Sequence, residues 1–490
     1  MLSNKVQAIV LAAGRSSRFN TNRTKLLEKI CGQEMILYIT QVLEHLSIAT
    51  TLVVGYQKEL IQELVIKKHG SSIKFIAQQE PRGTGDALLC TKNTWEREHV
   101  LVMNGDMPLV SSDIIEKLYE KHISTQADIS FVIAHNPDAS IGGYGRIVKN
   151  DKSISIVEAR DFEGDANEHC CVNAGIYLAS KQFLLETINA ISLNEKTHEF
   201  YITDLIKIAS DQQRTITTVA APFDYVRGIN NFQELWAAEH IKRAEIIKHW
   251  MERGVHFSVA HNIQIDLEVT IGPGSYIGGG VHLFAGTQIG KNVQIYEFSS
   301  IQNSTIADDA IIHAHSLIKD SQIGSYAQVG PFAHIREHSI IEEGATIGNF
   351  VEVKQSVVGK QTKAKHLSYI GDARIGTNAN IGAGTITCNY NGASKNQTVI
   401  KDNAFVGSNN TLVAPVTIGE SAFTAAGSVI TEDVPDQALA IGRTRQVNKE
   451  GYAAKLRQKP SEADRMVIDE ATGSFSFLGA VKTKNNNQST

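Results

Sequence analysis

The stretch IGPGSYIGGGVHLFAGTQIGKNVQI, residues 271–295, repeats an aliphatic side chain at every sixth position. The positions are Ile271, Ile277, Leu283, Ile289 and Ile295. A six-residue repeat is typical of a parallel β-helix, in which each hexad forms one flat side of a coil and the aliphatic side chain points inward. Strands of a β-sandwich alternate every two residues instead. This stretch therefore predicts a β-helix.

The same spacing begins at Ile265 and continues, with one-residue slips, to Ile430. It is interrupted by GAGTITCNYNGASKNQTVI, residues 382–400, and returns at Val406. A small residue often follows the aliphatic one, and we expect it to let the chain turn the corner between flat sides. These residues include Gly272, Gly278, Gly290, Gly324, Gly348, Gly376, Gly382, Gly407 and Gly419. The sequence thus predicts a β-helix over residues 255–450, with one excursion from its coils.

Residues 1–229 follow a different pattern, in which short aliphatic runs alternate with amphipathic stretches. The runs QAIVLAAG, ATTLVVGY, IKFIAQ, VLVMNGD and ISFVIA have the character of buried strands, and SSDIIEKLYEKH has the spacing of a helix. This alternation predicts a doubly wound, mostly parallel α/β sheet. Substrates of such sheets bind at the carboxyl ends of the strands.

Residues 230–254 carry apolar side chains at helical spacing and end in a glycine. We expect a helix here, which either links the two domains or closes the core of the first. The tail, residues 451–490, loses the six-residue spacing and ends in KTKNNNQST. This end is too polar to bury the surface that ordered structure needs, so we expect it to be disordered.

The composition is that of a soluble globular protein. A chain of 490 residues calls for at least two domains. A formal net charge of -5 excludes the extended basic surface that nucleic acid or an anionic membrane requires, and no apolar run approaches the ~20 residues of a membrane span. The 5 cysteines show no CxxC spacing, so we expect no disulfide framework and no thiolate zinc site, and a cytoplasmic location.

A candidate phosphate site follows the first predicted strand, in LAAGRSSRF, residues 11–19. Exposed backbone amides of this glycine turn, together with Arg15, Arg18 and Lys25, would balance the charge of a triphosphate. A glycine turn after a first strand is also often no more than a turn. The P-loop pattern GxxxxGK[ST] does not occur in the sequence.

Two further features of this domain favour phosphate chemistry. In NGDMPL, residues 104–109, Asp106 comes just after an apolar strand. A carboxylate there can hold Mg2+ against substrate phosphates, although strand-end aspartates also cap helices. In QQEPRGTGDA, residues 78–87, Gly83, Thr84 and Gly85 allow a base or ribose to approach the backbone closely.

The predicted β-helix carries a second candidate site. Arg336 and Lys354 are 18 residues apart, which is three hexads and places both on the same side of successive coils. Such a pair fits a phosphate site or two solvated surface charges. His366 could take a proton from an attacking amine near neutral pH. A zinc site is the alternative role for this histidine, because Zn2+ prefers imidazole ligands. The spacing of the histidines does not decide between the two roles. The other candidate ligands are His313, His315, His334 and His338.

Together these residues resemble the bacterial bifunctional N-acetylglucosamine-1-phosphate uridylyltransferases/glucosamine-1-phosphate acetyltransferases. The resemblance covers residues 6–452, and its most specific stretches are KHLSYIGDARIGTNANIGAGTITCNYNG (365–392) and VGSNNTLVAPVTIG (406–419). It implies a Rossmann-like uridylyltransferase, a linking helix, and a left-handed β-helix of hexapeptide repeats that forms a homotrimer. It also implies glucosamine-1-phosphate, acetyl-CoA, N-acetylglucosamine-1-phosphate and UTP as substrates, with Mg2+ as cofactor.

For the first half, the resemblance implies contacts to UTP, sugar and metal. The triphosphate would meet Leu11, Ala12, Ala13, Gly14 and Lys25, and the uracil would meet Gln78, Gly83 and Thr84. The sugar-1-phosphate would meet Gly145, Glu158, Asn173 and Asn230. Asp106 and Asn230 would hold Mg2+ while the sugar-1-phosphate oxygen attacks the α-phosphorus of UTP and pyrophosphate leaves.

For the second half, the resemblance implies acetyl transfer with His366 as the base. Arg336 and Lys354 would hold the substrate phosphate, Tyr369 and Asn380 the sugar, and Asn389 and Tyr390 would lie at the acetyl-transfer centre. Positions that bind coenzyme A match Ala383, Lys395, Ser408, Ala426 and Arg443. In the family, a loop at the place of CNYNGASKNQTV completes a site between subunits, which accounts for the interrupted spacing.

The N-terminal motif departs from the family pattern. The family reads GxGTRM where this chain has GRSSRF, and proline where Thr24 precedes Lys25. Ser16 carries a Cβ where glycine gives the backbone free approach, which bears on the affinity for UTP or the choice of triphosphate. Two alternatives stay open: a single-activity sugar nucleotidyltransferase whose β-helix only oligomerises or regulates, and a β-helical scaffold with a degenerate nucleotide domain.

Overall fold

The computed structural model describes residues 2–15, 19, 22–136, 143–150, 153–162, 170–457, 466–468 and 475–477. Ser16, Arg18 and the polar end of the tail, which the sequence analysis singled out, lie outside these residues. The chain divides into two units, residues 1–441 and 442–490. The second unit contains α10 (Tyr452–Leu456) and an antiparallel hairpin of β42 (Met466–Ile468) and β43 (Phe475–Phe477).

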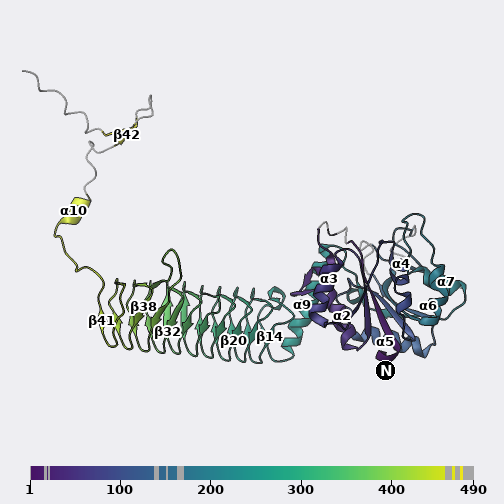
Figure 1. The fold of residues 1–490 in the computed structure, drawn as a ribbon, viewed down its shortest axis with the longest axis horizontal. Helices are drawn as coiled ribbons and strands as arrows, with labels where there is room; N and C mark the ends of the chain where they lie inside the picture. The colour runs from purple at the N-terminus through teal and green to yellow at the C-terminus, as the bar shows by residue number, and fades with distance from the viewer. Residues whose placement is uncertain are drawn as a thin grey trace, which may run out of the picture. The chain divides into compact units, whose positions relative to one another are not determined.

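The N-terminal half of the first unit is an α/β sheet built from the aliphatic runs (Figure 1). Four parallel strands are adjacent in the order β6-β1-β4-β5. They are β1 (Val6–Ala12), β4 (Ala49–Val54), β5 (Lys74–Ala77) and β6 (His99–Asn104). Alternate residues of β1 enter two different hydrophobic clusters, so the sheet is buried on both faces. The α/β prediction is confirmed.

Helices on the two faces of this sheet enclose those two clusters. One cluster is completed by α2 (Met35–His45), α3 (Lys58–His69) and α5 (Ser112–Ser124), which includes the predicted helical stretch. The other is completed by α4 (Thr84–Leu89), α6 (Lys181–Thr187) and α7 (Asp204–Asp211).

The remaining strands make the sheet mixed. β10 (Cys171–Ser180) runs antiparallel between β6 and β7 (Ile129–His135), and β11 (Ile216–Ala221) pairs in parallel with β7. A hairpin of β8 (Arg146–Asn150) and β9 (Ser153–Val157) pairs with β10. The pairing of β10 with β7 shifts register between Asn173 and Tyr177, where Gly175 has a φ of 74°.

The C-terminal half of the first unit is the predicted β-helix. Its strands form three parallel sheets, and each coil contributes one strand to each sheet (Figure 1). The first sheet runs from β12 (His256–Phe257) to β41 (Leu439–Ala440), the second from β13 (Gln264–Ile265) to β40 (Val429–Ile430), and the third from β14 (Thr270–Ile271) to β38 (Val416–Ile418).

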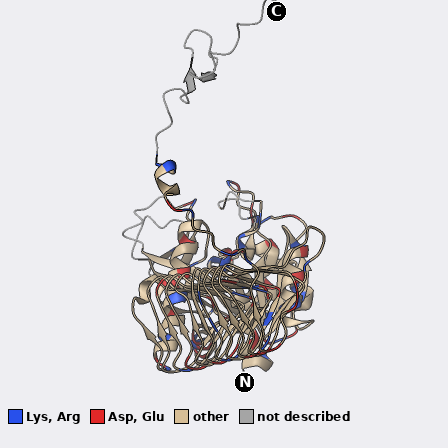
Figure 2. Ribbon diagram, turned by 90° about the vertical axis from the view of Figure 1, so that its left-hand side faces the viewer, with Lys and Arg blue, Asp and Glu red and all other residues tan. Residues whose placement is uncertain are grey.

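The inward positions of the coils are the aliphatic residues of the six-residue repeat. Ile277 of β15 (Tyr276–Ile277) lies beside Ile295 of β18 (Gln294–Ile295), and both are fully buried. Viewed along the stack, the coils overlie one another, with Lys and Arg interspersed among Asp and Glu (Figure 2). The β-helix prediction is confirmed.

The glycines that follow the aliphatic residues have another role than the predicted one. Corners between the first and second sheets are turned by bulky residues with positive φ, such as Phe298 at 56° and Phe350 at 56°. Gly272 has no positive φ, but a Cβ there would lie 2.5 Å from the carbonyl carbon of Gly290 on the next coil. These glycines therefore allow successive coils to approach closely rather than turn the corner.

Helix α9 (Phe232–Met251) occupies the segment between the two halves. Asn231 caps it by accepting a hydrogen bond from the Glu234 amide at 2.8 Å. Leu235 and Ile246 of α9 share one hydrophobic cluster with Ile229 and with the first coils of the β-helix. The helix thus packs against the core of both halves.

The composition led to expectations about membrane spans and about the cysteines. Within the described ranges, no helix is both long and apolar enough to cross a bilayer. All five cysteines carry unpaired thiols, and burial raises the pKa of Cys31 to about 12.

Candidate functional site

A cavity of about 510 Å³ opens at the carboxyl ends of β1 and β6. A second cavity of about 250 Å³ adjoins it and shares Leu11, Thr84, Asp106 and Asn230 with the first. The first cavity is lined by all residues that the sequence analysis placed at triphosphate, uracil and metal: Leu11, Ala12, Ala13, Gly14, Lys25, Gln78, Gly83, Thr84, Asp106 and Asn230. The second is lined by the three others placed at the sugar: Gly145, Glu158 and Asn173.

Asp106 lies where the two cavities meet. Its Oδ2 accepts a hydrogen bond from Lys25 Nζ at 2.5 Å, and the same ammonium donates to Asn230 Oδ1 at 3.1 Å. Asp106 Oδ1 is buried and has no hydrogen-bond partner among the described residues. An unpaired carboxylate oxygen beside a second oxygen ligand fits a hard cation such as Mg2+. A backbone hydrogen bond holds Asn230 close to Asp106, since the amide of the preceding residue, Ile229, donates to the Asp106 carbonyl at 2.9 Å.

The loop of Gln78 and Gly83 is held by the segment Phe200–Thr203. Gly83 has a φ of 101°, and a Cβ there would lie 2.5 Å from the carbonyl oxygen of Phe200. Only glycine meets both conditions, because L side chains rarely adopt this φ and the space is filled. Gly85 N donates to that carbonyl at 2.8 Å, and Ile202 N donates to Thr84 Oγ1 at 3.0 Å.

In the second cavity, two buried hydroxyls hold the side chains predicted to meet the sugar. Asn173 Nδ2 donates to Tyr177 Oη at 2.5 Å. Thr203 Oγ1 donates to Glu158 Oε1 at 2.8 Å. Burial raises the pKa of Glu158, the Thr203 hydroxyl opposes this rise, and the nearby carboxylates of Asp204, Asp161 and Glu199 add to it. Burial and the neighbouring carboxylates thus disfavour the charged form of Glu158, and the Thr203 hydroxyl stabilises it.

Some lining residues were not found by sequence reasoning. Asn104, Arg160 and Glu199 line the first cavity, and Tyr144 and Tyr201 line the second. Arg160 comes two residues after the predicted contact Glu158, and a cation so close to a predicted substrate contact is a signal that the sequence offered. The others reach the cavities through sheet order, which sequence spacing does not reveal.

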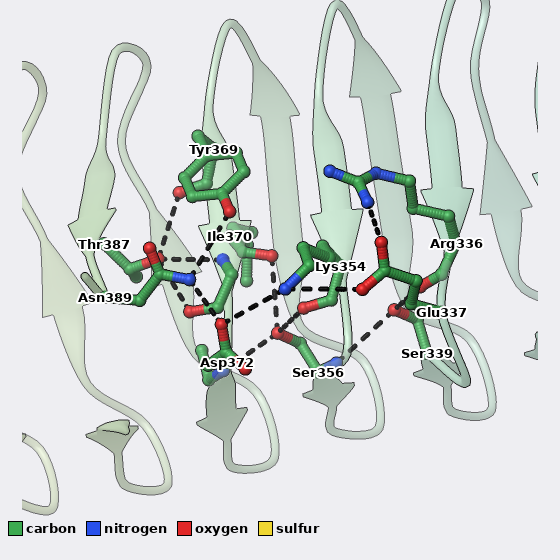
Figure 3. Close-up of polar contacts among 12 residues, drawn as sticks. Arg336, Glu337, Ser339, Lys354, Ser356, Tyr369, Ile370, Asp372, Thr387 and Asn389 are labelled. Atoms are coloured by element: carbon green, nitrogen blue, oxygen red, sulfur yellow. Dashed lines mark hydrogen bonds and ion pairs between the residues drawn. The ribbon is translucent and has the colours of Figure 1, made fainter. Parts of the chain in front are cut away.

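The second sheet of the β-helix carries the other predicted constellation (Figure 3). Arg336, at the end of β25 (His334–Arg336), and Lys354, at the end of β28 (Glu352–Lys354), are register partners on successive coils, as predicted. Arg336 Nε donates to Glu352 Oε1 at 2.8 Å, and the guanidinium also pairs with Glu337. The Lys354 ammonium, whose side chain is 6% exposed, lies 3.4 Å from Glu337 Oε2.

The next coil adds Tyr369 and Asp372 to this constellation. Asp372 Oδ2 is 3.5 Å from the Lys354 ammonium and accepts a hydrogen bond from Asn389 Nδ2 (Figure 3). Asn389 Nδ2 also lies 3.4 Å from Tyr369 Oη. A Cβ at Gly371 would lie 2.5 Å from that hydroxyl, so the glycine leaves room for the tyrosine ring over the sheet.

The excursion from the coils is a hairpin of residues 389–397. Tyr390 pairs with Lys395 across it, and Gly392 at its tip has a φ of 96°. The hairpin brings the Lys395 amine next to Lys354, and the side chain of Lys354 with its positive charge lowers the pKa of Lys395. Lys395, predicted at coenzyme A, thus lies with the cations predicted at the substrate phosphate.

His366 ends β30 (Lys363–His366) at the corner between the first and second sheets, where it is exposed. Its Nδ1 is 3.0 Å from Oδ1 of Asn349, its register partner on the preceding coil. An amide oxygen only accepts hydrogen bonds, so this contact assigns the ring proton to Nδ1 and leaves the Nε2 lone pair available as a base. Asn349 was not found by sequence reasoning.

Three residues predicted at coenzyme A continue the column that His366 begins. Ala383, Ser408 and Ala426 each stand two residues beyond the inward residue of a first-sheet strand, as His366 does. Successive strands lie ~4.8 Å apart, so these small residues line a straight track that starts beside the histidine.

Two predicted residues are not brought into these groups. Asn380, in β33 (Asn380–Ile381), lies on the first sheet, whereas Tyr369 lies on the second. Arg443 belongs to the second unit of the chain. The zinc alternative finds no support in the part of the chain that the structure describes, where no group of three or more His, Cys, Asp or Glu is placed to hold a metal ion.

Comparisons with known proteins cover both halves. A MobA-like NTP transferase domain matches residues 8–179, and a GMPPB C-terminal domain matches residues 259–347. Among solved structures, the uridine diphosphate N-acetylglucosamine pyrophosphorylase from Trypanosoma brucei, in complex with inhibitor, aligns with a TM-score of 0.41 and 12% identity, over 51% of this chain and 67% of that chain.

Two curated relatives span nearly the whole chain. The bifunctional protein GlmU of Exiguobacterium sibiricum is 39% identical over 451 residues, which is 91% of this chain and 99% of the relative. The bifunctional protein GlmU of Koribacter versatilis is 36% identical over 467 residues, which is 93% of this chain and 98% of the relative. With both of its halves matched at this level, the chain belongs to the family of bifunctional GlmU proteins.

Proposed function

We propose that this chain makes UDP-N-acetylglucosamine in two steps. Its β-helix transfers the acetyl group of acetyl-CoA to the amine of glucosamine-1-phosphate. Its α/β domain then transfers UMP from UTP to the N-acetylglucosamine-1-phosphate formed, with release of pyrophosphate. One observation carries the proposal: within a match to bifunctional relatives over both halves, each half holds a polar site of its own.

In the uridylyl half, the larger cavity takes UTP and the smaller one takes the sugar-1-phosphate. Backbone amides of Leu11–Gly14 and the Lys25 ammonium balance the charge of the phosphates. Gln78, Gly83 and Thr84 meet the uracil, and Gly145, Glu158 and Asn173 meet the sugar. A phosphate oxygen of the sugar attacks the α-phosphorus of UTP, the new P–O bond forms, and the bond to the leaving pyrophosphate breaks.

Asp106 and Asn230 would hold the metal of this half, Mg2+. When bound, the ion would neutralise the charge of the phosphates, and it takes oxygen ligands of the kind that these two side chains offer. The unpaired Asp106 Oδ1 supports this assignment, and Lys25 would pass from the carboxylate to a phosphate oxygen.

In the acetyl half, His366 acts as the base. Arg336 and Lys354, with Lys395 beside them, hold the substrate phosphate, and Tyr369 holds the sugar. The substrate nitrogen attacks the thioester carbonyl while His366 Nε2 takes its proton. The C–N bond forms, the C–S bond breaks, and coenzyme A leaves as the thiol. Asn389 and Tyr390 lie at this centre.

We place coenzyme A along the column of small residues that follows His366. An extended chain fits the straight track of Ala383, Ser408 and Ala426, with its thioester at the histidine end. Arg443 would meet the far end of the cofactor.

The homotrimer is part of the proposal. A stack of Phe298, His315, Phe332 and Phe350 runs along the corner that leads to His366, with ring centroids 5.2, 4.9 and 5.4 Å apart. The three phenylalanines are 57%, 48% and 56% exposed. Such a continuous apolar strip favours burial against another subunit. Light scattering on the purified protein would test the predicted mass of three chains.

A cytoplasmic location also stays a proposal. Unpaired thiols persist in a reducing compartment, and this agrees with the five unpaired cysteines.

The deciding experiment measures two products from one preparation. Free coenzyme A thiol is measured with acetyl-CoA and glucosamine-1-phosphate, with glucosamine-6-phosphate as the control. Pyrophosphate is measured with UTP, Mg2+ and N-acetylglucosamine-1-phosphate. We expect thiol release with the 1-phosphate only, together with pyrophosphate release. Pyrophosphate without thiol would reduce the β-helix to a structural module and favour the single-activity alternative.

A further inference from the structure

Asp372 contacts both ends of the 389–397 hairpin. Its Oδ2 accepts a hydrogen bond from the side-chain amide of Asn389, the first residue of the hairpin (Figure 3). Its carbonyl oxygen accepts a hydrogen bond at 3.2 Å from the amide of Thr398, the first residue after the hairpin. One residue therefore joins the point where the chain leaves the coils to the point where it returns.

The same residue is bonded to Lys354. Asp372 Oδ2 lies 3.5 Å from the Lys354 ammonium, and Asp372 N donates to the Lys354 carbonyl at 3.1 Å. Asp372 has a φ of 49°, a corner conformation that turns its carboxylate back over the second sheet toward the lysine (Figure 3). The lysine and the hairpin base are thus held by one carboxylate, whose side chain is 14% exposed.

The hairpin transmits this anchoring to its outer residues. Asn396 N donates to Asn389 O at 2.6 Å, and Tyr390 pairs with Lys395 above it. At the tip, Asn391 Oδ1 accepts hydrogen bonds from the amides of Ala393 and Ser394 at 3.0 and 2.8 Å. Because the hairpin is bonded internally, fixing its base also fixes Tyr390 and the Lys395 amine beside Lys354.

We propose that Asp372 is a positioning residue of the acetyl-transfer site, which holds the 389–397 hairpin and the Lys354 ammonium in one geometry. This inference rests on the proposed acetyltransferase function. Asp372 acts through Asn389 and Lys354, and the substrate meets those two groups. A misplacement of about 1 Å at such groups can cost as much as a hundredfold in rate.

The test uses the full chain with Asp372→Asn. Asparagine has nearly the same size and tolerates the corner conformation, so the backbone is kept while the charge is lost. We expect the KM for glucosamine-1-phosphate to rise and the kcat of thiol release to fall, each by about tenfold or more. Pyrophosphate release by the other half of the same chain should be unchanged, which controls for folding.

The matched control is Asp320→Asn. Asp320 has a φ of 48° at the same kind of corner and accepts an amide hydrogen bond from Asn303 at 2.7 Å, but no residue assigned to the acetyl-transfer site contacts it among the described hydrogen bonds and ion pairs. We expect this variant to keep both activities. Equal loss of thiol release in the two variants would assign the effect to the corner and would overturn the proposal.

A second readout follows the hairpin without any activity. Lys395 is a trypsin site on an anchored hairpin, and we expect faster cleavage there in Asp372→Asn than in the parent or in Asp320→Asn. Asn389→Asp should also speed cleavage, because it places two carboxylates together. Combining it with Asp372→Asn restores an amide opposite a carboxylate and should slow cleavage again.

Thiol release and trypsin cleavage together distinguish a failure of the Asp372 proposal from a failure of the proposed acetyltransferase function. If the parent protein releases no thiol, the proposed function fails while the cleavage experiment still tests the anchoring. If the parent is active and Asp372→Asn matches it in KM, kcat and cleavage, Asp372 does not position the site.

Discussion

The tautomer and orientation of the His366 ring are set by a residue on the preceding coil. Its Nδ1 is 3.0 Å from Asn349 Oδ1, a contact across 17 residues of sequence. The ring is otherwise exposed at a corner, so this hydrogen bond decides which nitrogen carries the proton and where the other nitrogen points. Without this hydrogen bond, the ring would spend part of the time in the other tautomer, in which Nε2 carries the proton and cannot act as the base.

Replacing Asn349 with alanine should therefore slow acetyl transfer without weakening substrate binding. We expect the kcat of thiol release to fall by about tenfold, because a positioned base contributes a hundredfold or more and only its orientation is lost. The KM for acetyl-CoA should stay within about twofold. Steady-state kinetics of thiol release would measure both values.

The control for that variant is Asn378→Ala. Asn378 has a φ of 55° and donates to Asn403 Oδ1 at 3.0 Å in a similar ladder of amides between coils, away from the histidine. A fall in kcat as large in Asn378→Ala as in Asn349→Ala would show that the ladder stabilises the coils and does not orient the base.

Glu158 offers a prediction about pH in the other half. Burial raises its pKa, and the hydrogen bond from Thr203 opposes the rise because it stabilises the charged form. Thr203→Val removes that donor, so the pKa should rise further. The ionised carboxylate is the form that accepts sugar hydroxyls, and its loss as pH falls should begin at a higher pH in the variant.

The measurement is kcat/KM of pyrophosphate release against pH, with N-acetylglucosamine-1-phosphate as the varied substrate. The acid limb should move to higher pH in Thr203→Val and stay in place in Thr203→Ser, which keeps the donor. An unmoved limb in both variants would mean that Glu158 does not titrate in the reaction, and our sugar contact would lose its support.

At the scale of the element, the close approach of successive coils limits the size of the residue at certain positions. Where the backbone of one coil lies 2.5 Å from the Cβ position of Gly272, a side chain of any size forces the coils apart. Gly279→Ala is a gentler change, because its Cβ would meet only the side chain of Val259, at 3.2 Å. The two glycines lie seven residues apart, just after the consecutive strands β14 (Thr270–Ile271) and β15 (Tyr276–Ile277), which makes them a matched pair.

We expect Gly272→Ala to lower the stability of the β-helix by about 1 to 3 kcal/mol, the usual cost of overpacking. Gly279→Ala should cost less than about 1 kcal/mol, since the valine can move. Thermal unfolding followed by circular dichroism would compare them. Equal midpoints would show that the coils separate locally at little cost, and the close approach would then not explain the glycines.

Periodicity predicted the coils because each inward position lies one hexad from the next, so the neighbouring sequence alone is enough to recognise it. It also paired Arg336 with Lys354, since three whole hexads separate them. It missed Asn349 beside His366, because a one-residue slip shortens that coil to 17 residues. It missed Asp372 and the place of Lys395, because the hairpin leaves the coils and returns by hydrogen bonds that no spacing encodes. The glycines were recognised from the repeat, yet their physical reason lies between coils.

In the α/β half, local runs predicted the strands but could not order them. Asn104, Tyr144 and Tyr201 meet in one cavity only because β10 runs antiparallel beside β6 and the hairpin β8-β9 folds against it. Pairings between strands far apart in the sequence depend on packing of the whole sheet. The predicted residues that line the two cavities there came from resemblance to a family, not from the pattern of the sequence.

At the scale of the molecule, the two candidate sites lie in different folds. The described hydrogen bonds and ion pairs of Asp106 stay within residues 25–230, and those of His366 and Lys354 within 337–395. Changes at one site should therefore leave the chemistry of the other intact. Asp106→Ala should abolish pyrophosphate release and keep thiol release, and His366→Ala should do the reverse.

A mixture of these two variants tests how the steps are joined. With glucosamine-1-phosphate, acetyl-CoA, UTP and Mg2+, neither variant alone should make UDP-N-acetylglucosamine. The mixture should make it, after a lag, because N-acetylglucosamine-1-phosphate formed by the Asp106→Ala protein must leave it and bind to the His366→Ala protein. Adding more of the second protein should shorten the lag. If the parent protein, compared at matched activities, makes the product without any lag, the intermediate passes between its sites without release, and the two halves act as one coupled enzyme instead of two enzymes on one chain.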